Sequence, residues 1–396
     1  MKAMLTRRIA GAAFAAALLA SSVLTGTAHA QTPFKIGLIL PMTGPSQSTG
    51  KQIDAAVKLF IKQNTDMVAG RKIEVILRDD AGVADTTRRV AQELVVKDHV
   101  NALAGFGLTP LALAVAPIAT QAKIPMIVMS AATSVITEKS PFIVRSSQTA
   151  PQIASAFGAY EAKQDVKKVV TLVADYGPGI DMETWFSKMF TAGGGTIVAN
   201  LRVPLANPDF APFLQRVRDE KPDAVFVFTP SGMGAIFIKQ FVEKGLDKSG
   251  IKLIATGDVT DDDQLNGMGD VTLGVVTAGP YSASHVSPAN VSFVTSFKEN
   301  NNNMRPNFMA VFGYDGMRVL YDAIKKTGGK AEGEALVEAM KGASWESPRG
   351  PVQIDPATRE IVQDVYIRKV VKTNGELYND EFTSVKQVRD PAKGAP

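Results

Sequence analysis

Short apolar runs alternate with helix-length amphipathic segments along most of this chain. Residues 34–40 are apolar at nearly every position, which is typical of a strand covered on both faces. The segment that follows places Ile53, Val57 and Phe60 on one face at helical spacing. The alternation continues through strands predicted at 73–77, 102–104 and 126–129 and helices predicted at 85–96 and 110–121. Such alternation predicts right-handed βαβ units and a parallel sheet, so a first α/β lobe should be complete by about residue 147.

The same alternation starts again after Pro151. It predicts a helix to about residue 163, strands at 169–173, 197–203, 224–228 and 252–255, and helices at 182–192, 210–218 and 235–244. The remaining segments, helices at 311–326 and 334–341 and strands at 352–354 and 365–371, are too few for a third domain. We therefore expect an α/β fold of two doubly wound parallel-sheet lobes with a ligand cleft between them. Lobe 1 would comprise residues 31–147 plus about 282–345, and lobe 2 residues 148–281 plus about 346–396.

The first 30 residues have the pattern of a secretory signal peptide. Lys2, Arg7 and Arg8 precede an apolar run at 9–24, and residues 28–30 (AHA) offer a small-residue cleavage site. The run is shorter than the roughly 20 residues that span a bilayer. We expect cleavage after Ala30, by the general secretory route rather than the twin-arginine route, and a periplasmic mature protein.

The net charge of +4 comes mostly from this leader, which holds three of the 43 basic residues and none of the 39 acidic ones. The remaining 366 residues carry +1, which argues against nucleic acid or an anionic membrane as a partner. The chain has no cysteine, so it can have neither a disulfide nor a lipidated N-terminal cysteine. We expect a diffusible monomer.

Side chains that carry out catalysis or bind metals are sparse. His99 and His285 lie far apart in the sequence, without metal-ligand or catalytic-triad spacing. Residues 105–110 (GFGLTP) begin like a dinucleotide fingerprint but place Pro110 where the third glycine belongs. The acidic run 261–263 lacks the spacing of a calcium loop, and we expect a solvated helix start there. No catalytic residue, no metal site and no cofactor is predicted.

Two loops are suited to holding a small carboxylate. Thr109 and Pro110 predict a helix start, with the Thr109 hydroxyl at the N-cap and the proline at the first helical position. The free amides and positive dipole end of that helix would attract an anion. Residues 130–134 (SAATS) follow the predicted strand 126–129 and offer hydroxyls at the same sheet edge. Either loop alone could be ordinary capping, but together they favour an anion site.

At these residues the chain resembles the periplasmic solute-binding proteins of ATP-driven importers, of the leucine/isoleucine/valine-binding type. The resemblance covers nearly all of the chain after the leader. Its motifs occur in the family's order, at residues 40–45 (LPMTGP), 78–80 (RDD), 116–119 (APIA), 124–125 (IP), 130–133 (SAAT), 175–179 (DYGPG), 221–225 (KPDAV) and 314–316 (YDG).

The resemblance implies a type I periplasmic binding protein fold, in which three crossovers join two lobes that close on the ligand by hinge bending. It implies that a carboxylate clamp is formed by Thr109, Ala131 and Thr133. Tyr176 matches an aromatic residue that closes over the ligand, and Asp258 matches an acid that pairs with the ammonium of an amino acid.

Further pocket residues are implied at positions where this chain departs from the family. Ser231 matches a pocket loop in which this chain is one residue shorter. Thr49 occupies a place usually held by an aromatic residue, and Asp258 replaces a glutamate with a carboxylate one methylene shorter. Phe106 and Tyr281 are candidate apolar walls, although core packing is the better interpretation of both.

The function implied is that of an extracytoplasmic receptor that delivers a small apolar carboxylate to an inner-membrane ABC permease and its ATPase. The ligand expected first is a branched-chain or other hydrophobic amino acid. An aromatic or keto acid without an amino group would tolerate the changes at Thr49 and Asp258 and is the alternative ligand. An exported sensory binding protein is a second alternative, and an exported enzyme a third.

Overall fold

Each central strand of the two sheets is apolar on both faces because helices cover both sides of its sheet. In β9 (Ala224–Phe228), Phe226 and Phe228 belong to one buried cluster, whereas Val225 and Val227 belong to a second cluster on the opposite face. The computed structural model describes residues 31–394. The chain divides into residues 1–32 and residues 33–396, and the second unit is described below. The predicted signal peptide at 1–30 lies outside the described residues.

The first lobe is built on a six-stranded sheet in the order β2-β3-β1-β4-β5-β6. Its strands are β1 (Gln31–Leu40), β2 (Met67–Val68), β3 (Arg71–Asp79), β4 (Ala102–Gly105), β5 (Met126–Val128) and β6 (Ile143–Arg145). Its helices are α1 (Gln47–Asn64), α2 (Ala84–Val96), α3 (Thr109–Ala122), α9 (Pro288–Asn300), α10 (Phe308–Lys326) and α11 (Gly333–Met340), with a 3-10 turn η1 (Ser134–Lys139). Strands β1, β4, β5 and β6 run parallel.

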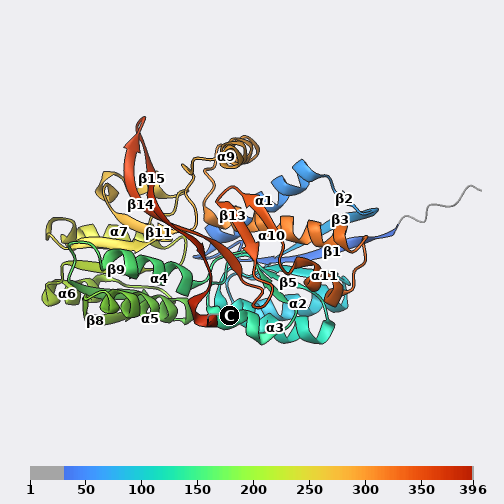
Figure 1. Ribbon diagram of the computed structural model, residues 1–396, viewed down its shortest axis with the longest axis horizontal. Coiled ribbons are helices and arrows are strands. Elements are labelled where there is room, and N and C mark those ends of the chain that lie inside the picture. The colour runs from blue at the N-terminus through green and yellow to red at the C-terminus, as the bar shows by residue number, and fades with distance from the viewer. Residues whose placement is uncertain (1–30, 395–396) are drawn as a thin grey trace, which may run out of the picture. The chain divides into compact units, whose positions relative to one another are not determined.

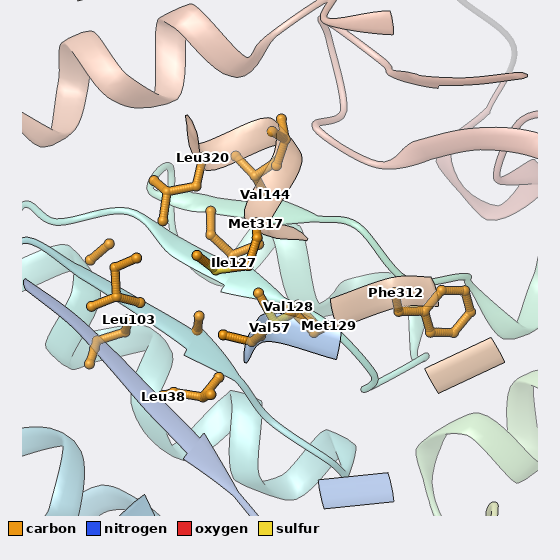
Figure 2. Packing of buried hydrophobic residues seen from close by; sticks show 14 of the residues in the cluster. Leu38, Val57, Leu103, Ile127, Val128, Met129, Val144, Phe312, Met317 and Leu320 are labelled. Atoms are coloured by element: carbon orange, nitrogen blue, oxygen red, sulfur yellow. The ribbon is translucent and has the colours of Figure 1, made fainter. Parts of the chain in front are cut away.

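Helices cover both faces of this sheet, with α1 and α10 on one face and α2 and α3 on the other (Figure 1). Figure 2 shows Ile127 of β5 beside Met317 of α10, with Leu320 of α10 and Val57 of α1 in the same buried cluster. All four side chains are buried. The apolar contacts therefore fix the helices on the sheet and hold the loops at its carboxyl edge in place.

The second sheet has nine strands in the order β12-β13-β14-β11-β10-β9-β7-β8, and β15 pairs with β14. Its strands besides β9 are β7 (Lys168–Ala174), β8 (Thr196–Val203), β10 (Lys252–Thr256), β11 (Val276–Gly279), β12 (Ser344–Ser347), β13 (Gly350–Ile354), β14 (Ile361–Thr373) and β15 (Glu376–Val388). Its helices are α4 (Ala150–Glu161), α5 (Gly177–Ala192), α6 (Ala211–Glu220), α7 (Gly234–Glu243) and α8 (Leu265–Met268), with 3-10 turns η2 (Leu246–Lys248), η3 (Asp270–Thr272) and η4 (Pro391–Lys393). Strands β7 to β11 are parallel, and β14 joins β11 antiparallel.

The chain passes between the two lobes three times. The first passage is residues 146–149, between β6 and α4, and the second is residues 280–287, between β11 and α9. The third runs along β14, which begins with Ile361 in the core of the first lobe and continues with Val365 and Ile367 in the core of the second. Figure 1 shows β14 and β15 as a long hairpin that extends through the second lobe.

The predicted succession of strands and helices is confirmed, with ends displaced by a few residues. The patterns did not predict the 13-residue helix α9, the short strands β2, β6, β11 and β12, or β15, most of whose side chains are exposed. The predicted lobe boundaries stay a prediction. Val352 and Ile354 pack in the core of the first lobe while β13 pairs with β14, so the segment after residue 346 contacts both lobes.

A buried ion pair ties the first lobe to the start of β14. Nε of Arg145, the last residue of β6, lies 2.5 Å from Oε2 of Glu360, and the two side chains are 0% and 1% exposed. The Thr137 hydroxyl also donates to Glu360, over 2.7 Å. Because both charges are removed from water, each depends on the other for compensation.

We expect Glu360→Gln to lower the free energy of unfolding by about 3–5 kcal/mol, because it leaves a buried guanidinium without its counter-charge. Urea denaturation of the purified protein measures this loss. Asp322→Asn is the matched control, since its pair with Arg318 is also short, at 2.7 Å, but exposed, and its removal should cost less than about 1 kcal/mol. Similar losses in the two variants would show that the buried pair carries no special stability.

Candidate ligand-binding site

A pocket lies where the carboxyl ends of strands from both sheets face each other. Its lining residues follow β4, β5 and β6 in the first lobe and β7, β9 and β10 in the second. They are Thr49, Gly107, Leu108, Thr109, Ser130, Ala131, Ala132, Gln148, Tyr176, Pro178, Phe228, Pro230, Ser231, Asp258 and Met309. This is the edge at which parallel sheets commonly bind ligands.

The structure brings most of the predicted site residues together. Six of the eight line the pocket, namely Thr49, Thr109, Ala131, Tyr176, Ser231 and Asp258. Thr133 is one hydrogen bond away from Thr109. Phe106 and Tyr281 lie in the hydrophobic core, and the Tyr281 hydroxyl donates to Asn290 over 2.9 Å. The binding role of these residues stays a prediction.

Two threonine hydroxyls meet at one corner of the pocket, where Thr109 is a lining residue and Thr133 contacts it. The Oγ1 atoms of Thr109 and Thr133 are 3.0 Å apart, and the backbone N–H of Thr133 points to Thr109 Oγ1 over 3.4 Å. The prediction that Thr109 caps α3 is wrong, because Leu108 is the N-cap and Thr109 is the first helical residue. The Thr109 hydroxyl is therefore directed to Thr133 rather than to the backbone of its own helix.

The starts of two helices meet at this corner. The first turn of α3 begins at Thr109; Pro110 has no N–H, and the N–H groups of Leu111 and Ala112 donate to the Leu108 carbonyl over 3.1 and 3.3 Å. Gly177, the first residue of α5, approaches so closely that an added Cβ would lie 2.4 Å from Thr133 Oγ1. Both helices direct the positive ends of their dipoles toward the corner, which suits it to an anion such as a carboxylate.

Arg145 supports the loop that carries Thr133. Its guanidinium donates to the carbonyl oxygen of Thr133 over 2.7 Å and also to that of Ala131. The Ala131 N–H donates to the Phe106 carbonyl over 3.0 Å. Arg145 does not line the pocket, and a lone arginine at the end of a short strand carries no sequence signal for such a role.

An aromatic pair forms the second-lobe wall. The rings of Tyr176 and Phe228 lie 6.1 Å apart and are inclined by only 15°. Pro178 and Pro230 flank these two residues in the chain and also line the pocket. Phe228 was not predicted as a site residue because it ends an apolar strand, where an aromatic side chain is typical of the core.

Asp258 is the charged member of the lining residues and is only 5% exposed. Burial raises its pKa to about 6, although the Thr256 hydroxyl, 3.0 Å away, and the charge of Arg368 both favour the ionised form. Burial also raises the pKa of the Tyr176 hydroxyl, and the negative charge of Asp258 adds to that shift. Asp258 can therefore change charge in a mildly acidic solution.

Asp261 and Asp262 of the acidic run after Asp258 are buried and Asp263 is half-buried, so the prediction of a solvated helix start is wrong. Asp261 accepts a hydrogen bond from the Ser231 hydroxyl, and Asp262 accepts one from Asn379 over 3.0 Å. Asp263 accepts from Ser48 of the first lobe over 2.6 Å. These acids hold the 258–263 loop in place and link it to α1.

One further pocket residue has an unused polar group. Gln148 is only 4% exposed and lines the pocket, and its Oε1 is buried without a hydrogen-bond partner. It lies on the first passage between the lobes, and an isolated glutamine there gives no motif that the sequence could reveal.

The described residues contain no group of three or more histidine, cysteine, aspartate or glutamate side chains placed to hold a metal. His285 lies against Glu381, with Nδ1 2.6 Å from Oε2, and does not line the pocket. Between residues 31 and 394, no helix is both long and apolar enough to cross a membrane.

Known proteins match the chain over almost its whole length. The family model of the periplasmic binding proteins matches residues 33–376. A "Leu/Ile/Val-binding protein homolog 6" from Brucella melitensis is 42% identical over 380 residues, which are 95% of this chain and 97% of the relative.

Two solved structures are similar in both sequence and fold. An ABC transporter solute-binding protein from Rhodopseudomonas palustris BisB5, in complex with 3,4-dihydroxybenzoic acid, is 62% identical with a TM-score of 0.90 and covers 91% of this chain and 99% of its own. A second solute-binding protein from R. palustris, in complex with 4-hydroxybenzoate, is 40% identical with a TM-score of 0.87 and the same coverage.

We expect Thr133→Val to weaken the binding of a small carboxylate ligand at least tenfold, because it removes a hydrogen bond to a charged group worth about 1.5–3 kcal/mol. Calorimetry measures this loss of affinity. The ligand to use is the carboxylic acid that raises the melting temperature of the wild-type protein most. Thr133→Ser keeps the hydroxyl and should keep most of the affinity. Unchanged affinity in the valine variant would reject the assignment of Thr133 to the clamp.

Proposed function

The chain belongs to the periplasmic binding protein family, and we propose that this solute-binding protein of an ABC transporter captures an aromatic carboxylate. The observation that carries the proposal is the pairing, in one pocket, of an anion-binding corner with a flat aromatic wall. The corner consists of Thr109, Thr133 and the starts of α3 and α5, and the wall consists of Tyr176 and Phe228. A benzoate ring suits such a wall because aromatic rings gain from stacking as well as from burial.

Thr49 and Asp258 differ from the residues that the family resemblance implies at these positions. Both differences favour an acid without an amino group over an amino acid as the ligand. Thr49 lines the pocket with a side chain smaller than the aromatic residue that the family resemblance implies there. Asp258 has a raised pKa and one side-chain hydrogen bond, so part of it is neutral near pH 6 and it is poorly prepared to pair with an ammonium group. The hydroxybenzoate ligands of the two R. palustris structures support this choice, whereas the name of the Brucella relative supports a branched-chain amino acid.

The ligand reaches the pocket by a movement of the lobes. Only about 20 Å³ of the pocket can hold the centre of a water molecule, which is room for about one water. Because Gly177 of the second lobe already touches Thr133 of the first, a ring can enter only when the lobes separate. Closure over the ligand then produces the form that a membrane permease can recognise.

In this role the protein acts in the periplasm, with an ABC permease and ATPase as partners, and performs no chemistry on its ligand. Two measurements would separate this role from the alternatives. We expect no turnover of the ligand during prolonged incubation, as for a receptor and not an enzyme, and loss of uptake of the same acid on deletion of the gene, as for transport and not sensing.

A thermal-shift screen tests the ligand class directly. Benzoate, 4-hydroxybenzoate and 3,4-dihydroxybenzoate should raise the melting temperature, because each binds only the folded protein. Leucine, isoleucine and valine should raise it less at equal concentration. A larger shift with the amino acids than with the aromatic acids would overturn the aromatic assignment.

The pH dependence of benzoate binding provides a second prediction. Ionised Asp258 repels a bound carboxylate, so affinity should rise as the pH falls from 8 to 5 through the Asp258 pKa of about 6. The ligand stays largely ionised over this range, since carboxylic acids titrate near a pH of about 4. An amino acid whose ammonium pairs with Asp258 should show the opposite trend.

Asp258→Asn serves as the control for this measurement. Asp261, Asp262, Tyr176 and Arg368 surround Asp258 and remain in the variant, so any loss of pH dependence reports on Asp258 itself. Calorimetric titration with benzoate at pH 5, 6, 7 and 8 should give a flatter profile for the variant than for the wild type. An identical profile would show that Asp258 does not sense the ligand charge.

A further inference from the structure

Gln148 lines the pocket with a buried amide oxygen that has no hydrogen-bond partner. Eight described residues have a buried side-chain oxygen or nitrogen without a partner, and among them Gln148 is the one that lines the pocket. A buried amide that makes no hydrogen bond is costly to the folded protein. Its position therefore points to a partner supplied from the pocket.

Four other polar side chains of the pocket have hydrogen-bond partners within the protein. The Thr109 hydroxyl is bonded to Thr133, and the Ser130 hydroxyl donates to the Gly107 carbonyl over 2.9 Å. Asp258 accepts from Thr256, and Ser231 donates to a buried aspartate. Gln148 is thus set apart from the anion-binding corner and from the acids of the second lobe.

The backbone on either side of Gln148 is firmly held. The Ser146 carbonyl accepts from Arg349 over 2.6 Å, and the Ser146 hydroxyl donates to the Phe312 carbonyl over 3.0 Å. On the other side, the Thr149 N–H donates to Gln152 Oε1 over 2.9 Å at the start of α4. The Gln148 side chain is therefore presented to the pocket from a fixed position between the lobes.

The sheet order sets the distance of Gln148 from the carboxylate corner. Thr109 follows β4 and Gln148 follows β6, and these two strands are separated by β5. Two interstrand spacings of about 4.8 Å each place the strand ends about 10 Å apart. The carboxylate and the 4-hydroxyl oxygens of a hydroxybenzoate lie about 6 Å apart, and a hydrogen bond of about 2.8 Å at each end lets the ligand bridge a separation of this order.

A phenolic hydroxyl has the chemistry that the Gln148 amide requires. The hydroxyl can donate to the amide oxygen and accept from the amide N–H, so either orientation of the amide can be satisfied. The ring itself needs only apolar contacts. In the proposed function the carboxylate binds at the two threonines and the starts of α3 and α5.

We propose that Gln148 recognises the ring hydroxyl opposite the carboxylate and makes the protein selective for 4-hydroxylated aromatic acids over benzoate. This proposal rests on the proposed function, because it assumes that the ligand is an aromatic carboxylate. It assigns Gln148 a role in specificity and not in holding the acid group. A site built to hydrogen-bond a ligand hydroxyl discriminates against the analogue that lacks it, because a buried polar group is then left unpaired.

Calorimetry on wild-type protein and on Gln148→Met, with benzoate, 3-hydroxybenzoate and 4-hydroxybenzoate, tests the proposal. Methionine keeps the length of the side chain and removes its hydrogen-bonding groups. We expect the variant to lose about tenfold in affinity for 4-hydroxybenzoate and to bind benzoate at least as well as the wild type. The affinity for 3-hydroxybenzoate should change by less than that for 4-hydroxybenzoate.

Benzoate is the internal control for folding, since a damaged pocket would lose affinity for all three acids. Gln148→Glu adds a second check, because it keeps an acceptor for the phenolic proton and should retain more affinity for 4-hydroxybenzoate than the methionine variant does. Equal losses for all three acids, or no loss for 4-hydroxybenzoate, would overturn the role of Gln148 while leaving the proposed function intact. Failure of the wild type to bind any of the three acids would overturn both.

Discussion

One buried guanidinium determines the arrangement of the first-lobe side of the pocket. Arg145 pairs with Glu360 and also donates to the carbonyl oxygens of Ala131 and Thr133. A charge without access to water is tolerated only where nearly all of its donors have partners, so the loop cannot move without exposing or orphaning that charge. The position of the Thr133 hydroxyl, and with it the contacts to Thr109 and Gly177, follows from this constraint.

The pocket has no cation among its lining residues. The first-lobe residues that line it are neutral, and Asp258, in the second lobe, is the charged lining residue. The carboxylate binding that we propose would therefore depend on hydroxyls, backbone N–H groups and helix dipoles. The buried acids of the second lobe are balanced by Arg368, which donates to Thr277 and to the Tyr281 carbonyl behind the pocket. This separation of charge leaves the ligand-facing surface almost neutral, which suits the burial of an aromatic ring.

The fold could be predicted from the sequence because the spacing of apolar residues marks its strands and helices. A doubly wound sheet is covered by helices on both faces, so its strands are apolar at nearly every position. The pocket loops followed from the same reasoning, since parallel strands bring their carboxyl ends to one edge. What the sequence could not reveal depends on long-range contacts. Arg145 pairs with a glutamate 215 positions away in the sequence. In the sequence Phe228 looks like a core residue, and only the structure shows its ring beside that of Tyr176. The burial of the acidic run arises in the same way, from Asn379 and Ser48, which are distant in the chain.

In the proposed mode of binding, the pocket separates recognition of the acid group from recognition of the rest of the ligand. A corner formed by Thr109 and Thr133 would hold the carboxylate of an amino acid or of a benzoate equally well, because it would contact only the group that the two ligands share. Selection between the ligand classes would then fall to Thr49, Asp258 and Gln148, which also line the pocket. We propose that Thr49 sets the available width, Asp258 the charge, and Gln148 the presence of a neutral polar partner. A change of ligand class within this fold thus needs few substitutions, and none of them disturbs the buried ion pair that holds the corner in place.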